Sequence, residues 1–128
     1  MSSQMLKQLL YEIGYWRQLS GFMMEENIHH KNSLSLLLKD NLYESLLDEI
    51  DFFHSRFIRE DNVIRFLRNN IAELDTLLAG ENLTDCLLPD KIQKEIKSLR
   101  KNMNNSAADF CVLKNDFNTF LSENIFYP

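Results

Sequence analysis

Apolar residues recur along the chain at alternating intervals of four and three residues. The clearest run extends from Leu46 to Leu78, where nine of ten positions are apolar and the remaining one is Glu60. This heptad spacing predicts a long helix with one apolar face, as in coiled coils. A glycine at the place of Gly80 commonly ends a helix, so we expect this helix to end near Ala79. The series is Leu46, Ile50, Phe53, Phe57, Glu60, Ile64, Leu67, Ile71, Leu74 and Leu78.

A second run with the same spacing extends from Ile92 to Asn124. Pro89 stands just before it, and proline is favoured in the first turn of a helix because its missing N–H would have no partner there. The spacing keeps its phase through the weak helix formers Asn104–Ser106, where a loop would usually shift it. We therefore expect one helix over residues 89–124. A break at Asn104–Ser106 is the alternative and would give a four-helix bundle.

The N-terminal run is weaker but predicts a helix over residues 3–39. Its heptad series includes three polar residues, and the apolar Met24, Ile28 and Leu38 lie beside the series. A slight rotation of the helix would bring these neighbours into the core instead. The polar members of the series are Ser20, Asn27 and His30.

The Asp40-Asn41 pair can cap a helix, so we expect a tight turn there and a second helix over residues 41–79. A start after Asn32-Ser33 is the alternative. The chain contains only three Gly and two Pro, which favours a few long helices over a sheet with many turns. Short connections make consecutive helices antiparallel. The sequence thus predicts an all-α, up-down-up bundle of three helices, forming a single domain of residues 1–128.

Composition narrows the classes of function. The formal net charge of −5 disfavours binding to nucleic acid or to anionic membranes, because both require clustered Lys and Arg. No stretch approaches the roughly 20 apolar residues of a membrane span, and the N-terminus lacks a signal-peptide pattern. We therefore expect a cytoplasmic protein. Cys86 and Cys111 are too few and too far apart for a disulfide framework or a zinc cluster.

Three parts of the chain carry a recognisable pattern: Trp16, the segment DEIDFFHSRFIREDNVIRFLRNNI at 48–71 and LKNDFNTFLSE at 113–123. Together they are similar to a family of small, uncharacterised bacterial helical-bundle proteins of the antiparallel coiled-coil type. Members carry a Lys-Asn-Thr turn where this chain reads Lys-Asp-Asn at 39–41. The resemblance covers most of the chain and implies the helical fold and the turn. It implies no activity, substrate or cofactor.

The sequence contains no glycine-rich phosphate loop, Cys-x-x-Cys pair, nucleophile elbow or HExxH motif, so we expect neither enzymatic activity nor a cofactor. Two pairs do have the spacing of metal ligands on bundle helices, Glu26-x-x-His29 and Asp51-x-x-His54. A hairpin folded about residue 40 would set Glu26 opposite His54 and His29 opposite Asp51. Zinc, iron or manganese would suit these ligands. The heptad phase favours solvated ion pairs at these positions instead.

A polar layer inside the bundle is a further prediction. The same folding about residue 40 puts Ser20 level with Glu60, and folding about the second connection puts Ser106 within about one turn of them. A buried carboxylate is costly without partners, so Glu60 should reach solvent or accept hydrogen bonds from these hydroxyls. Such a layer can set the register of repetitive helices. His30, also in the series, is expected to be a partly buried histidine with satisfied hydrogen bonds rather than a ligand.

Two classes of function remain. The first is a non-catalytic interaction or scaffold module that binds a protein partner or itself, because long amphipathic helices readily accept another helix along a groove. The second is a metal-binding bundle using Glu26, His29, Asp51 and His54. The absence of catalytic motifs favours the first class.

Overall fold

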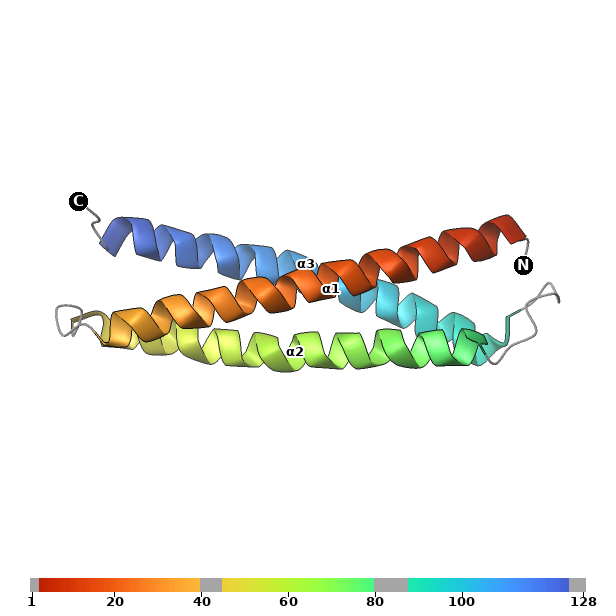
Figure 1. Cartoon of the computed structure of the whole chain (residues 1–128), viewed down its shortest axis with the longest axis horizontal. Helices are drawn as coiled ribbons and strands as arrows, with labels where there is room; N and C mark the ends of the chain where they lie inside the picture. Colours follow the sequence, from red (N-terminus) through yellow and green to blue (C-terminus); the bar gives the residue numbers. More distant parts are fainter. Residues whose placement is uncertain (1–2, 40–44, 80–87, 125–128) are drawn as a thin grey trace.

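Three long helices run side by side, and each reverses the direction of the one before it (Figure 1). The structure, a computed structural model, describes residues 3–39, 45–79 and 88–124, and within these ranges it contains no strand. The predicted all-α, up-down-up bundle is therefore confirmed. The helices are α1 (Ser3–Leu38), α2 (Leu47–Ala79) and α3 (Asp90–Asn124).

Most of the predicted helix limits agree with the structure. α3 is continuous through Asn104–Ser106, so the four-helix alternative is wrong. The Pro89 carbonyl accepts a hydrogen bond from the Gln93 N–H at 3.1 Å, and this bond closes the first turn of α3. α2 begins at Leu47, after a short 3-10 turn at 45–46, instead of at the predicted residue 41. The Asp40-Asn41 turn and the Gly80 cap lie outside the described residues.

The heptad positions of all three helices face the shared interior, where burial of apolar surface stabilises the bundle. Even in α1 the polar members of the series are buried, whereas Met24, Ile28 and Leu38 are exposed. The alternative in which a rotation of α1 brings these neighbours into the core is therefore wrong. The reason is that the apolar residues on either side of the polar stretch hold the whole helix in one phase. Those flanking core residues are Leu9, Ile13, Trp16, Leu34 and Leu37, and the buried Met23 lies between the polar members.

The core is built in layers, with one residue from each helix. In the clearest layer, the rings of His30 and Phe57 lie 4.9 Å apart between centroids, and Phe117 lies 5.0 Å from Phe57 and 5.3 Å from His30. A separate small cluster forms another layer, which consists of Met23, Ile64 and Phe110.

These layers determine the register of the helices. In both, the numbers of the α1 and α2 residues add to 87, so the α1–α2 hairpin is symmetric about a point between residues 43 and 44. The predicted symmetry about residue 40 is wrong. Symmetry about residue 40 would pair each α1 residue with an α2 residue seven positions, or about two helical turns, away from its observed partner. The physical reason is the connection, because the chain runs from Leu38 to Leu47 before α2 begins.

The alignment of the parallel helices α1 and α3 is marked by two ion pairs. The guanidinium of Arg100 binds Glu12 at 2.6 Å and the Lys114 ammonium binds Glu26 at 3.1 Å. Partners in each pair are 88 residues apart, and the two pairs are two heptads apart along each helix. Both pairs therefore mark one common register.

Candidate interaction surface

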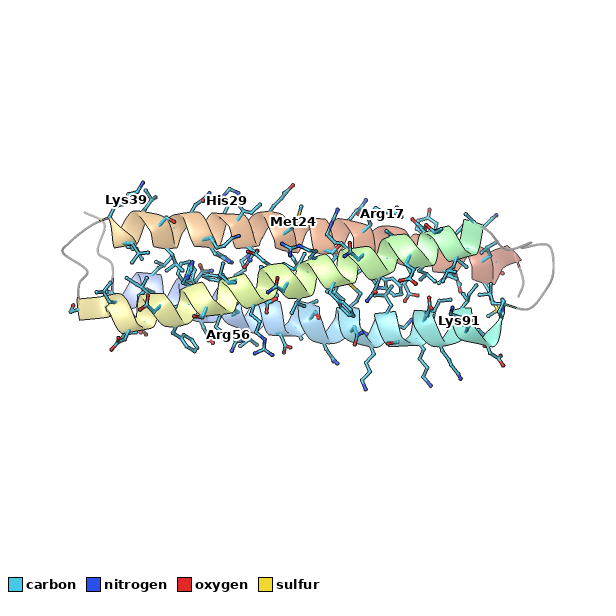
Figure 2. The ribbon with its side chains drawn as sticks, turned by 90° about the horizontal axis from the view of Figure 1, so that it is seen from below. Arg17, Met24, His29, Lys39, Arg56 and Lys91 are labelled. Atoms are coloured by element: carbon cyan, nitrogen blue, oxygen red, sulfur yellow. The ribbon has the colours of Figure 1, made fainter. Side chains whose placement is uncertain are left out.

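The predicted metal ligands do not come together. Among residues 3–39, 45–79 and 88–124 no three His, Cys, Asp or Glu side chains form a group that could hold a metal ion. Glu26 binds Lys114 instead, and His29 lies exposed on the outer side of α1 (Figure 2). Asp51 and His54 are exposed on α2. The observed register puts Glu26 level with the stretch near residue 61, about 10 Å along α2 from His54.

The predicted layer of Ser20, Glu60 and Ser106 is not formed either. Ser20 donates to the Arg17 carbonyl at 3.2 Å and accepts a hydrogen bond from the Arg68 guanidinium at 3.2 Å. Glu60 lies one heptad before the α2 residue that is level with Ser20, and it is itself level with Asn27. The shifted hairpin register is the cause, because it moves the α2 partner of Ser20 from residue 60 to residue 67.

Asn27 is a buried polar residue whose amide nitrogen is hydrogen-bonded, whereas its Oδ1 has no partner among the described residues. Its side-chain N–H groups donate to the Phe57 carbonyl at 2.9 Å and to an Asp61 carboxylate oxygen at 2.7 Å. The other oxygen of Asp61 accepts from the Lys31 ammonium at 2.6 Å. This network ties α1 to α2 at mid-length, and its role is structural.

His30 is enclosed by aromatic rings, with Phe57 and Phe117 in its own layer and Phe110 at 5.9 Å between centroids. Burial lowers the pKa of His30, and the nearby Lys114 and His29 act in the same direction, while the Glu26 carboxylate at 3.8 Å opposes them. Nδ1 of His30 has no hydrogen-bond partner among the described residues, and Nε2 lies 3.8 Å from Glu26, beyond hydrogen-bond distance, so the prediction of satisfied hydrogen bonds is wrong.

Glu60 is only 6% exposed, so it does not reach solvent as one alternative required. One of its carboxylate oxygens has no hydrogen-bond partner within the described part of the chain. Burial raises the pKa of Glu60, a change that Asp109 reinforces and that Arg56 and Arg59 oppose. The buried polar residues of the described part of the chain are Ser20, Asn27, His30 and Glu60, and no hydrogen bond joins two of them.

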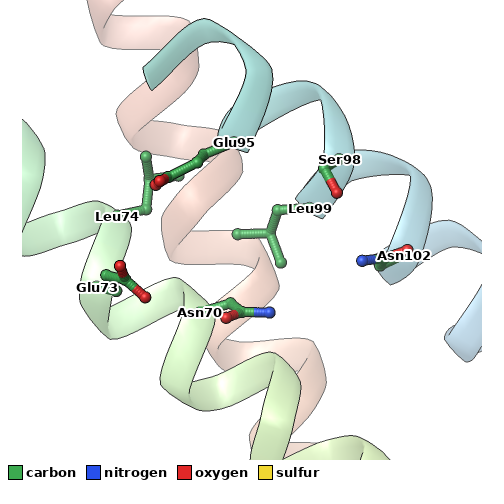
Figure 3. A pocket seen from close by; sticks show the side chains of 7 residues that line it. All are labelled: Asn70, Glu73, Leu74, Glu95, Ser98, Leu99 and Asn102. Carbon is green, nitrogen blue, oxygen red and sulfur yellow. The ribbon is translucent and has the colours of Figure 1, made fainter. Parts of the chain in front are cut away.

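A polar pocket lies between α2 and α3, where Glu73 and Glu95 approach from opposite helices and Leu74 and Leu99 form the floor (Figure 3). Two carboxylates without a third ligand do not make a metal site. The remaining lining residues are neutral and polar: Asn70, Ser98 and Asn102.

The outer side of α1 has a different character. A shallow groove lies there, and all of its lining residues belong to α1. Tyr11 is 83% exposed and Tyr15 is 61% exposed, and Leu10 is also exposed. A Cβ placed on Gly14 would have no neighbour within 4 Å, so the floor of the groove is open. We call this feature the α1 groove, and its lining is Lys7, Leu10, Tyr11, Gly14, Tyr15 and Gln18.

Sequence reasoning missed the α1 groove because it followed only the stronger of two patterns on this helix. The second pattern was visible in the sequence: Tyr11, Tyr15 and Phe22 repeat on the side opposite the core series. Aromatic residues are common in cores, so such a repeat does not by itself mark a surface. Only their exposure distinguishes a surface from a core.

Fold and site together define an elongated all-α bundle with a buried polar centre and an aromatic surface on its first helix. No helix in the described ranges is long and apolar enough to cross a membrane. The chain matches no protein-family model, and neither a curated protein nor a solved structure is significantly similar to it. The resemblance to uncharacterised bacterial helical proteins therefore stays a prediction.

Proposed function

We propose that this protein is a non-catalytic interaction module of the cytoplasm that binds a partner helix in the α1 groove. The groove carries the proposal. Large aromatic side chains exposed to water are unfavourable, and neighbouring ones commonly mark the surface where a partner binds. Tyrosine is also among the residues that contribute most to protein interfaces, because it buries a large area and keeps a hydroxyl for hydrogen bonding.

The open floor at Gly14 supports a helical partner in particular. A glycine inside a helix costs about 1 kcal/mol relative to alanine, and no neighbour in the described structure requires one here. A glycine lets another helix approach closely. The net charge of −5 favours a protein partner over nucleic acid.

Site-specific photo-crosslinking tests this function. Benzoylphenylalanine replaces Tyr15 in the full chain expressed in growing cells, and the matched control replaces Phe66 of α2, which is similarly exposed at 58%. We expect a heavier adduct from position 15 and none from position 66. Adding Gly14→Arg, which fills the groove, should abolish the adduct. Absence of an adduct at position 15, or an adduct that Gly14→Arg leaves unchanged, contradicts the proposal.

A further inference from the structure

The outward side of α1 carries a second regular series, longer than the α1 groove itself. The series has a basic residue at its start and an acidic residue at its end, and the aromatic residues lie between them. The core heptads face the opposite way. The members are Lys7, Tyr11, Gly14, Gln18, Phe22 and Glu25.

We propose that the partner in the α1 groove is a second copy of this chain, whose α1 packs antiparallel across a two-fold axis near Trp16. This inference rests on the proposed function, because it uses the same surface. A two-fold interface requires a surface that is complementary to itself. Since the series runs from a positive to a negative end, reversing its direction places opposite charges against each other.

Charge complementarity supports this occupant. Lys7 and Glu25 are both exposed, and neither forms an ion pair among the described residues. They lie nine residues on either side of Trp16. In the antiparallel pair, Lys7 of each copy therefore lies level with Glu25 of the other. Symmetry forms this ion pair twice, at the two ends of the interface.

The residues between the charged ends are also complementary. The same pairing sets Gln18 over the open Gly14 and brings Tyr11 of one copy within one residue of being level with Phe22 of the other. Phe22 is 53% exposed, and the Lys114 ammonium lies 5.6 Å from its ring centroid on the same chain. This cation–π contact orients the ring before a partner arrives. The aromatic contacts of the interface thus lie between its two charged ends. Protein interfaces commonly have such an apolar centre with a polar rim.

Sedimentation equilibrium of the purified full chain over a concentration series tests the pairing. We expect a monomer–dimer equilibrium. Lys7→Glu or Glu25→Lys alone should raise the dissociation constant by roughly tenfold or more, because each places two like-charge pairs in the interface. The double variant should restore it to within about threefold, because opposite charges face each other again. Lys91→Glu, a charge reversal on the exposed surface of α3, is the control that should change nothing.

Tyr11→Glu should give a monomer that is still helical by circular dichroism. A wild-type chain that is monomeric at every concentration overturns the proposal. So does a dimer that the single charge reversals do not weaken, or one that the double variant does not restore. If the chain is monomeric while position 15 still crosslinks to a different polypeptide and Gly14→Arg abolishes that adduct, the second copy is ruled out and the proposed function stands.

Discussion

Asn27 and Glu60 are polar residues in the same region of the core, but their surroundings differ. Each has one side-chain oxygen without a hydrogen-bond partner in the described structure, but the Asn27 amide also donates two hydrogen bonds. A buried polar group without partners costs about 1–3 kcal/mol. The two hydrogen bonds that Asn27 donates to α2 offset this cost, whereas no hydrogen bond to Glu60 offsets it among the described residues.

We predict that Glu60→Leu raises the free energy of unfolding at pH 7 by roughly 1–3 kcal/mol, because it removes a buried, poorly paired carboxylate. Chemical denaturation measures the change.

Burial raises the pKa of Glu60, so the folded state holds the proton more tightly, and stability falls as pH rises above the ordinary value of 4.5. Glu60→Gln should therefore stabilise at pH 7 and lose its advantage below pH 4.5. The exposed Glu73→Gln is the control, and equal effects at both positions contradict this account.

At the scale of the helix, the two glycines of α1 have different surroundings. A Cβ on Gly21 would lie 3.1 Å from the Arg68 guanidinium, which bonds the Arg17 carbonyl at 3.4 Å and the Ser20 hydroxyl. A Cβ on Gly14 would meet nothing within 4 Å. Gly21 thus lets an α2 arginine lie across α1, whereas Gly14 leaves a surface open.

We predict that Gly14→Ala stabilises the chain by about 0.5–1 kcal/mol through helix propensity. Gly21→Ala should gain less, because the new methyl group displaces Arg68 from its hydrogen bonds. Thermal or chemical unfolding compares the two, each in a Tyr11→Glu background so that pairing of α1 does not contribute. A gain at Gly21 equal to that at Gly14 would show that the Arg68 contact has no energetic weight.

At the scale of the whole molecule, the hairpin register decides which residues meet. Asn27 contacts Asp61 in the structure, whereas symmetry about residue 40 would have set it beside His54. This one difference removes both the predicted metal site and the predicted serine–glutamate layer. The register is thus the property that links the fold to the candidate sites.

A pair of introduced cysteines tests the register directly. In a chain with Cys86→Ser and Cys111→Ser, Asn27→Cys with Asp61→Cys should form a disulfide on mild oxidation, since two short side chains already touch at 2.7 Å. Asn27→Cys with His54→Cys should stay reduced. Free-thiol counting after oxidation measures both, and the opposite result would restore the symmetry about residue 40.

The sequence by itself determined the number of helices, nearly all their limits and the face of each that is buried. Heptad spacing is a local property, and the few Gly and Pro do not support a sheet with many turns as an alternative. Even polar members such as Asn27 and His30 were assigned to the correct face, because their phase follows from their apolar neighbours.

Tertiary structure decided the register, and with it the partners of Glu26, Ser20 and Glu60. A repeating pattern fits equally well after a shift of one heptad, so it does not specify which layer of α2 meets a given layer of α1. The length of the connection and the fit of His30 among three phenylalanine rings make that choice. Likewise, an aromatic repeat has the same spacing in a core and on a surface. Only the packed bundle shows that no other helix in the described ranges covers Tyr11 and Tyr15, which are 83% and 61% exposed.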